Sequence, residues 1–213
     1  MDTTPHSAVA VFDFDGTITR RDSTTAFCLA IVPAWRLGRA LARTAPGLAL
    51  GPTTRAAFKE SLMTALFRGV EERRLRDLAA GWATSELPRL VRPAALARLR
   101  WHQSEGHRVV LASASLELLV APWARTVGVG DVLATRLEVR DGRITGRLDG
   151  GNCYGPEKVE RLRALLGDLG AFELYAYGDG RGDRELLAAA RHPAYRTFHR
   201  ARHGRPSQTS TQR

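Results

Sequence analysis

Apolar residues along the chain follow two patterns, short continuous runs and runs with helical spacing. Continuous runs at 9–12, 109–111 and 172–177 are typical of buried strands. Segments with helical spacing separate them, and this alternation predicts an α/β fold with a mostly parallel sheet covered by helices on both faces. Further elements are predicted as a last strand at 195–198 and helices at 93–106, 116–126, from 155 onward and at 185–191.

The stretch between the first two strands carries only helical patterns. Segments 55–68 and 71–87 have apolar residues three and four positions apart, and Asp22 offers an N-cap oxygen at the start of the stretch. A helical insertion directly after a strand predicts a cap over the end of that strand. We therefore expect an α/β core at 1–20 and 93–200, a helical cap at 21–92 and a disordered basic tail at 201–213.

One segment has the pattern of a β-hairpin. Residues 133–148 alternate between apolar and polar positions on either side of Asp141-Gly142. Because both central residues of the commonest hairpin turn need a positive φ, an Asp-Gly pair between alternating segments is the strongest short-range signal for a hairpin.

The chain is strongly basic, with 32 lysine and arginine residues against 22 acidic ones and a net charge of +10. This charge points to anionic partners such as nucleic acid, anionic lipid or anionic substrates. Lys59 and Lys158 are the only lysines, so the excess is almost entirely arginine and is spread along the sequence. A GC-rich genome explains that composition equally well, and nucleic acid is not expected as a partner.

The apolar segment 27–50 raises the question of membrane contact. Arg36, Arg39 and Arg43 interrupt it at helical spacing, and it contains no run of 18 apolar residues, so it does not read as a membrane span. Packing on its own domain is the favoured interpretation, and peripheral contact with a membrane surface is the alternative.

The cysteines and the N-terminus bear on localisation. Cys28 and Cys153 lie far apart and form no CxxC pair, which favours a reducing compartment. The first twelve residues show no signal-peptide pattern. We expect a cytoplasmic location, with the inner face of the membrane as the alternative.

Two carboxylates follow the first strand. Asp13 and Asp15 are two residues apart, so an extended backbone would point them the same way, and Gly16 and Thr17 turn the chain out of the sheet. Ligands commonly bind at the carboxyl ends of strands in α/β sheets. Like charges this close repel unless a cation or a shared proton relieves them. The pair indicates a metal, a nucleophile and an acid/base.

Three more positions have similar contexts. Ser113 and Ser115 end the second strand before a helix, where small hydroxyl residues suit oxyanion binding. Lys158 lies on a predicted helix, and Asp179 and Asp183 follow the third strand. Each has a common structural explanation, as a cap, a solvated lysine or a turn. Their order along one chain favours a shared site.

This set of motifs resembles the haloacid dehalogenase (HAD) superfamily of phosphohydrolases. DFDGT corresponds to its first motif, the first serine after LA in LASAS to its second, Lys158 to its third and GDGRGD to its fourth. The helical insert places the chain beside the phosphoserine phosphatase-like subclass. The resemblance implies a Rossmann-like core with a helical cap and a Mg²⁺-dependent phosphatase.

The resemblance also implies roles for individual residues. Asp13 would be the nucleophile that forms an aspartyl phosphate, and Asp15 the general acid/base. Lys158 would keep Asp13 ionised. Implied Mg²⁺ ligands are Asp13, Asp15 through its backbone carbonyl, and Asp179, with Asp183 either a ligand or a carboxylate that supports the ligands. Implied phosphate-binding residues are Phe14, Gly16, Thr17, Ser113, Ala114 and Lys158.

The substrate is less well indicated. Relative to phosphoserine phosphatases, the segment after the first motif has Asp22 but no later glutamate, and Gly182 stands where asparagine is usual. NCYGPEKVERL, YAYGDGRGDRELL and segment 27–50 resemble the HAD-type phosphatidylglycerophosphate phosphatases, which act on a lipid phosphate at the membrane surface. We expect a phosphorylated small molecule or lipid as substrate.

Other function classes stay open. One is a basic protein that binds nucleic acid or membranes and retains a vestigial site, although the full set of carboxylates argues against degeneration. Another is a phosphotransferase, because an aspartyl phosphate can pass to an alcohol instead of water. The oligomeric state has no signature in the sequence.

Overall fold

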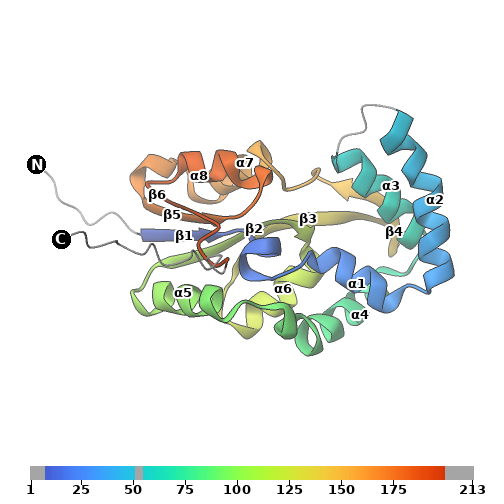
Figure 1. Cartoon of the computed structure of the whole chain (residues 1–213), viewed down its shortest axis with the longest axis horizontal. Helices are drawn as coiled ribbons and strands as arrows, with labels where there is room; N and C mark the ends of the chain where they lie inside the picture. The colour runs from blue at the N-terminus through green and yellow to red at the C-terminus, as the bar shows by residue number, and fades with distance from the viewer. Residues whose placement is uncertain (1–7, 51–54, 200–213) are drawn as a thin grey trace, which may run out of the picture.

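The computed structural model describes residues 8–50 and 55–199 and is built around one six-stranded sheet (Figure 1). The strand order is β4-β3-β2-β1-β5-β6, and every pair is parallel except β3 and β4. The strands are β1 (Ala8–Phe12), β2 (Arg108–Leu116), β3 (Asp131–Arg140), β4 (Arg143–Asp149), β5 (Glu173–Gly178) and β6 (His192–Tyr195). The predicted α/β fold is confirmed.

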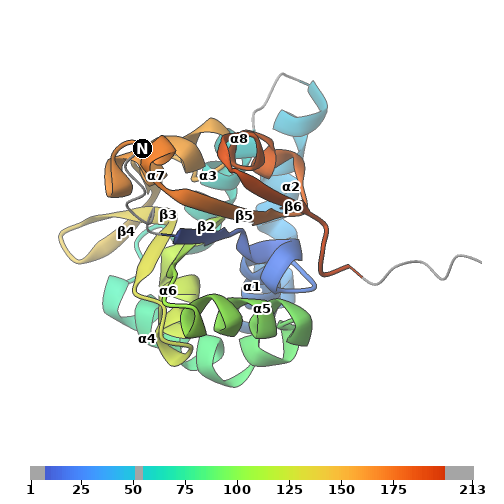
Figure 2. The ribbon, with the colours of Figure 1, turned by 90° about the vertical axis from the view of Figure 1, so that its left-hand side faces the viewer.

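Helices cover both faces of this sheet. In Figure 2, α7 (Pro156–Leu166) and α8 (Arg184–Ala189) lie on one side, and α5 (Pro93–Ser104) and α6 (Glu117–Thr126) lie on the other. The side chains of the central strand β1 pack into the apolar cores on both faces of the sheet, because successive residues of a strand point to opposite faces. Ala10 and Phe12 belong to the core on the α6 side, whereas Val9 and Val11 belong to the core on the α7 side. β1 is thereby held rigidly from both faces.

The stretch after β1 is helical, as predicted. It contains α1 (Ser23–Ile31), α2 (Ala34–Leu50), α3 (Arg55–Phe67), α4 (Glu72–Ser85) and a short 3₁₀ helix η2 (Leu87–Leu90). The Asp22 carboxylate caps α1 by accepting a hydrogen bond from the Thr25 amide at 2.6 Å, and Pro33 separates α1 from α2. These helices diverge, because α4 packs against α6 whereas α3 packs against β4.

The hairpin is confirmed with its predicted turn. Asp141 and Gly142 have φ values of 49° and 70° between the antiparallel strands β3 and β4, as the commonest two-residue hairpin turn requires. The hairpin extends the sheet beyond β2 and provides the surface on which α3 packs.

One sequence prediction about strands is wrong. The last strand is not at 195–198 but at His192–Tyr195, and Phe198 lies in the following turn, where its ring stacks on that of Tyr177 at 5.4 Å. Arg196 has a φ of 55°, which ends the extended conformation. The second strand ends next to Ser115 as predicted, because β2 continues to Leu116 and α6 begins at Glu117, one residue later than expected.

Within the described ranges, no helix combines the length and the apolar character required to cross a bilayer. The proposed boundaries between core and cap stay a prediction, and the predicted tail at 201–213 lies outside the described residues.

Candidate active site

A cavity of about 500 Å³ lies at the carboxyl ends of β1, β2 and β5. Seven of the ten residues to which the family resemblance assigned roles line it: Asp13, Asp15, Ser113, Ala114, Lys158, Asp179 and Asp183. Phe14, Gly16 and Thr17 are not among its lining residues. The Phe14 ring is fully buried and packs edge-to-face against Trp123, with ring centroids 5.2 Å apart. The predicted motifs therefore converge, while the turn after β1 supports them from behind.

The turn after β1 depends on a glycine. Gly16 has a φ of +85°, and a Cβ built on it would lie 2.2 Å from a carboxylate oxygen of Asp179. Its carbonyl oxygen accepts hydrogen bonds from Arg92 Nε at 3.2 Å and His199 Nε2 at 3.1 Å. Only glycine allows this conformation and this close approach together. The turn after β1 thus touches the loop after β5.

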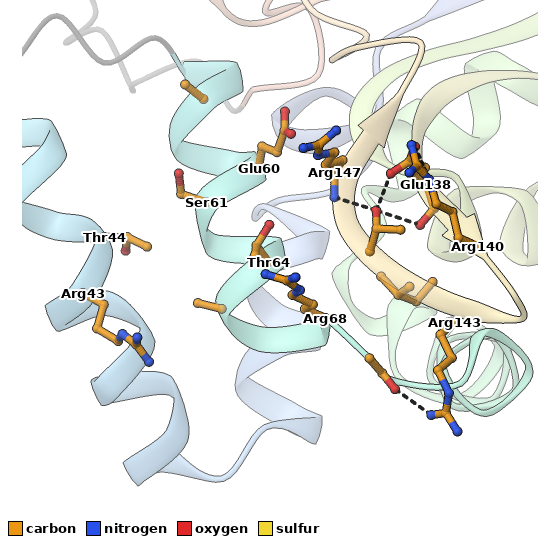
Figure 3. Close-up of a pocket in the computed structure, with 15 residues that line it drawn as sticks. Arg43, Thr44, Glu60, Ser61, Thr64, Arg68, Glu138, Arg140, Arg143 and Arg147 are labelled. Carbon is orange, nitrogen blue, oxygen red and sulfur yellow. Dashed lines mark hydrogen bonds and ion pairs between the residues drawn. The ribbon is translucent and has the colours of Figure 1, made fainter.

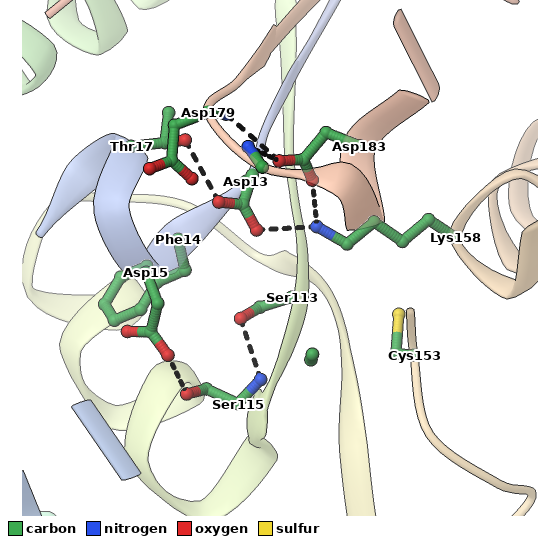
Figure 4. Close-up of polar contacts among 12 residues, drawn as sticks. Asp13, Phe14, Asp15, Thr17, Ser113, Ser115, Cys153, Lys158, Asp179 and Asp183 are labelled. Carbon is green, nitrogen blue, oxygen red and sulfur yellow. Dashed lines mark hydrogen bonds and ion pairs between the residues drawn. The ribbon is translucent and has the colours of Figure 1, made fainter. Parts of the chain in front are cut away.

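The Asp13 carboxylate lies in a buried hydrogen-bond network with the Lys158 ammonium (Figure 4). Its two carboxylate oxygens accept hydrogen bonds from Lys158 Nζ at 2.6 Å and from the Thr17 hydroxyl at 3.0 Å. Lys158 Nζ also contacts Asp183 Oδ1 at 2.7 Å. Burial raises the pKa of Asp13 to about 7, the Lys158 ammonium opposes that shift, and Asp183 adds to it. One lysine therefore serves two buried carboxylates.

The charge of Lys158 is stabilised in return. Burial alone would lower the pKa of this ammonium, but Asp13 and Asp183 outweigh burial and raise the pKa above its ordinary value. The lysine therefore stays protonated, as the sequence prediction requires.

Three carboxylates form an acidic cluster. Ligand atoms of Asp13, Asp179 and Asp183 lie within 4.8 Å of one another. Asp183 Oδ2 accepts hydrogen bonds from the amides of Asp179 at 3.0 Å and Gly180 at 2.9 Å, which fixes the loop after β5. Burial and the neighbouring Asp183 raise the pKa of Asp179. Three carboxylates around one lysine leave excess negative charge, and their hard oxygen donors fit a Mg²⁺ ion.

Asp15 occupies a separate environment. Its carboxylate accepts hydrogen bonds from the Ser23 amide at 2.9 Å, the Thr19 hydroxyl at 3.2 Å and the Ser115 hydroxyl. Burial and the nearby charge of Asp22 raise the pKa of Asp15 to about 6. The sequence predicted that a cation or a shared proton relieves the repulsion between Asp13 and Asp15. In the structure, the Asp15 side chain is instead bound by its own hydrogen-bond donors and is not part of the acidic cluster.

The second strand contributes its serines from an extended backbone. Because β2 continues to Leu116, Ser113 is not at a helix N-terminus, which corrects the sequence interpretation. The Ser113 hydroxyl is buried and accepts a hydrogen bond from the Ser115 amide at 2.9 Å. Sequence reasoning missed the contact of Ser115 with Asp15. The signal was its position two residues after Ser113, on the same face of a strand.

Helix α3 adds residues that sequence reasoning did not assign to the site. Phe58, Lys59, Leu62 and Met63 line the cavity from this helix. Lys59 Nζ donates a hydrogen bond to the Ala114 carbonyl oxygen. In a chain with only two lysines, both lie in this cavity, and that rarity was the available signal.

Gly182, which stands where phosphoserine phosphatases usually have asparagine, is explained by Tyr154. A Cβ at position 182 would lie 2.4 Å from the Tyr154 ring, and Tyr154 itself lines the cavity. The ring therefore occupies the space that a longer side chain would need.

Cys153, within the NCYGPEKVERL segment, is a packed thiol. It is fully buried and unpaired, and burial raises its pKa. Its Sγ contacts the Leu133 carbonyl oxygen at 3.4 Å. Such a group is a poor nucleophile.

A larger groove, of about 1110 Å³, lies elsewhere, between α2, α3 and the β3–β4 hairpin (Figure 3). None of the predicted site residues lines it. Its charged side chains are Arg43, Glu60, Arg68, Glu138, Arg140, Arg143 and Arg147. The larger groove therefore does not coincide with the candidate site, which is marked by the convergent carboxylates.

Known proteins share this architecture. CicA from Caulobacter vibrioides is 38% identical over 194 residues, which cover 89% of this chain and 86% of CicA. A probable phosphatase of Mycobacterium tuberculosis is 31% identical over 206 residues, covering 86% and 66% of the two chains. The fold also matches a substrate-bound phosphoserine phosphatase with a TM-score of 0.57, at 16% identity and with 86% and 83% of the chains covered. The model of the haloacid dehalogenase-like hydrolases matches residues 10–188, so the chain belongs to that family.

Proposed function

We propose that the protein is a Mg²⁺-dependent phosphatase that hydrolyses phosphomonoesters through an aspartyl phosphate on Asp13. The observation that carries this proposal is the separation of the two carboxylates. Asp13 is held by Lys158 and Thr17, whereas Asp15 is held across the same cavity by Ser23 and Ser115. This separation supports a role in attack on phosphorus for Asp13 and a role in proton transfer for Asp15.

In the first step, an oxygen of Asp13 forms a bond to phosphorus while the bond from phosphorus to the ester oxygen breaks. Asp15 in its protonated form gives its proton to the leaving alcohol. A pKa near 6 suits this role, because both protonation states are accessible near neutral pH.

In the second step, water attacks the phosphorus of the aspartyl phosphate. Asp15, now ionised, accepts a proton from that water, and the bond from phosphorus to Asp13 breaks. Inorganic phosphate leaves, and both carboxylates return to their starting states. Transfer to a second alcohol instead of water would make the protein a phosphotransferase, and product analysis separates the two.

Positive charge supports both steps. The Lys158 ammonium, the Ser113 hydroxyl and the backbone amides near Phe14, Gly16 and Ala114 are the groups proposed to bind the phosphoryl oxygens. Asp13, Asp179, Asp183 and the Asp15 carbonyl would hold the Mg²⁺ ion, which supplies charge neutralisation for the phosphoryl group when bound. The family membership and the relative named as a probable phosphatase support this reading.

The test is the variant Asp13→Asn, assayed with p-nitrophenyl phosphate and Mg²⁺. Loss of the nucleophile is expected to lower kcat by about 10⁴-fold or more. Asp77→Asn is the matched control, because Asp77 is exposed on α4 and lies outside the cavity. Near-wild-type turnover by Asp13→Asn, with the fold intact by circular dichroism, would refute the mechanism.

A lipid phosphate is a second candidate substrate, and one observation favours it. Leu29 and Trp35, at the junction of α1 and α2, are 64% and 69% exposed, and the Arg39 guanidinium lies 6.0 Å from the Trp35 ring. Exposed aromatic and aliphatic side chains beside arginine suit the surface of an anionic bilayer. Flotation with anionic vesicles at low salt tests it, and absence of binding removes the candidate.

A further inference from the structure

The cavity contains a second ammonium group besides that of Lys158. Lys59 lines it from α3, together with Phe58 and Met63 of the same helix. The Lys59 Nζ donates a hydrogen bond to the carbonyl oxygen of Ala114, which also accepts one from the Thr135 hydroxyl at 2.9 Å. This positive charge therefore comes from the helical insert, whereas the carboxylates of the acidic cluster come from the loops after β1 and β5.

The two lysines differ in how their charge is compensated. Lys158 forms ion pairs with Asp13 and Asp183, whereas Lys59 forms none with any residue in the described part of the chain. An ammonium has three N–H donors. The Ala114 carbonyl takes one, and no other described residue accepts from the rest.

Holding this charge in the cavity is costly for the free protein. Burial lowers the pKa of Lys59 to about 8, while Asp22 and Asp15 act against that shift from beyond ion-pair distance. A bound anion would give the ammonium the ionic partner that residues 8–50 and 55–199 do not provide. Charge-assisted hydrogen bonds of this kind are among the stronger ones in proteins.

We propose that the Lys59 ammonium binds a second anionic group of the substrate, a carboxylate or a second phosphate on the leaving alcohol. The inference rests on the proposed phosphatase function and narrows its substrates to phosphomonoesters whose organic part is itself negatively charged. Phe58 and Met63 beside Lys59 offer apolar surface to the carbon skeleton between the two charges.

Two matched pairs of compounds test this. O-phosphoserine and O-phosphoethanolamine differ only in a carboxylate, and 1,3-propanediol bisphosphate and 3-hydroxypropyl phosphate differ only in a phosphate. For each, kcat/KM is measured, and compounds that are not turned over are measured as inhibitors of p-nitrophenyl phosphate hydrolysis. The quantity of interest is the ratio within a pair, because a merely structural role of Lys59 would change both members alike.

For the wild type, we expect a higher kcat/KM for the compound with the second anionic group in at least one pair. The pair that shows this preference identifies whether Lys59 binds a carboxylate or a phosphate. Lys59→Met should reduce that preference about 10- to 100-fold, and Lys59→Arg should retain part of it. Arg68→Met is the control for loss of one positive charge, since Arg68 is exposed just beyond α3 and outside the cavity.

Three results would overturn the inference: no preference in either pair, an unchanged preference in Lys59→Met, or an equal loss for all four compounds, which would place Lys59 on the shared phosphoryl group. None of them is the failure of the phosphatase itself, because that failure appears as activity retained by Asp13→Asn.

Discussion

Substitution of Gly16 by alanine tests whether the close approach of two loops builds the acidic cluster. The new Cβ would lie 2.2 Å from an Asp179 carboxylate oxygen, whereas ordinary contact begins at 3.4 Å, so the carboxylate must move by about 1.2 Å. A misplacement of about 1 Å in a catalytic group can cost about 100-fold in rate. We expect a loss of that size in kcat/KM and a weaker response to Mg²⁺.

Backbone strain must be separated from this displacement. Gly16 has a φ of +85°, and an alanine there costs about 1–2 kcal/mol in stability for the conformation alone. Gly69 is a matched control, because its φ is +80° and nothing lies within 4 Å of a Cβ built on it. Gly69→Ala should therefore lose similar stability while keeping its activity and its Mg²⁺ response.

The assay is a Mg²⁺ titration of p-nitrophenyl phosphate hydrolysis, with urea unfolding measured in parallel. Gly16→Ala is expected to need about 10- to 100-fold more Mg²⁺ for half-maximal activity than Gly69→Ala, a range typical of disturbed metal surroundings. If the two variants gave superimposable Mg²⁺ curves, the contact between Gly16 and Asp179 would not shape the site.

Two further predictions concern buried charge. Lys158→Met should lower the free energy of unfolding by about 3–5 kcal/mol in EDTA at pH 8, because Asp13 and Asp183 stay buried without a cation. Urea unfolding should show a smaller loss of stability at pH 5 than at pH 8. An equal loss at both pH values would count against the explanation. His102 is buried beside Tyr177 and His107, and burial followed by the His107 charge lowers its pKa to about 4. The unfolded chain takes up this proton near pH 6.5 and the folded chain does not, so stability falls as the pH drops from 6.5 toward 4, by about 2 kcal/mol at pH 5. His102→Gln should show a smaller fall, and an identical urea profile would contradict this.

Local chemistry was sufficient to predict much of the fold. The apolar run before Asp13 forms a strand in any context that buries it, and Asp141-Gly142 favours one turn geometry by itself. The last strand was misplaced because β6 pairs only with β5 and carries Pro193, so neither alternation nor burial marks it. A strand at the edge of a sheet leaves a weak pattern in the sequence.

The site could be predicted only in part for a related reason. Motif residues such as Asp13 and Asp179 lie at strand ends, where the topology brings them together whatever the rest of the chain does. Lys59 reaches Ala114 only because α3 packs against β4, and no local pattern contains that packing. The position of Ser113 likewise depends on the pairing of β2 with β3, which extends the strand.

The link between α3 and the β3–β4 hairpin has a consequence for how substrates enter. The Gly69 amide donates to the Ile144 carbonyl at 2.8 Å, the Ile144 amide to the Val70 carbonyl at 2.9 Å, and the Glu72 amide to the Gly142 carbonyl at 2.9 Å. A Cβ on Gly146 would lie 2.3 Å from Thr64 Cα, so the backbones touch. These contacts join α3 and the segment that follows it to the hairpin, so a movement of α3 away from the hairpin would have to break them. We therefore expect substrate and product to pass the exposed rim of the cavity, while α3, which carries the proposed anion-binding Lys59, stays in place during turnover.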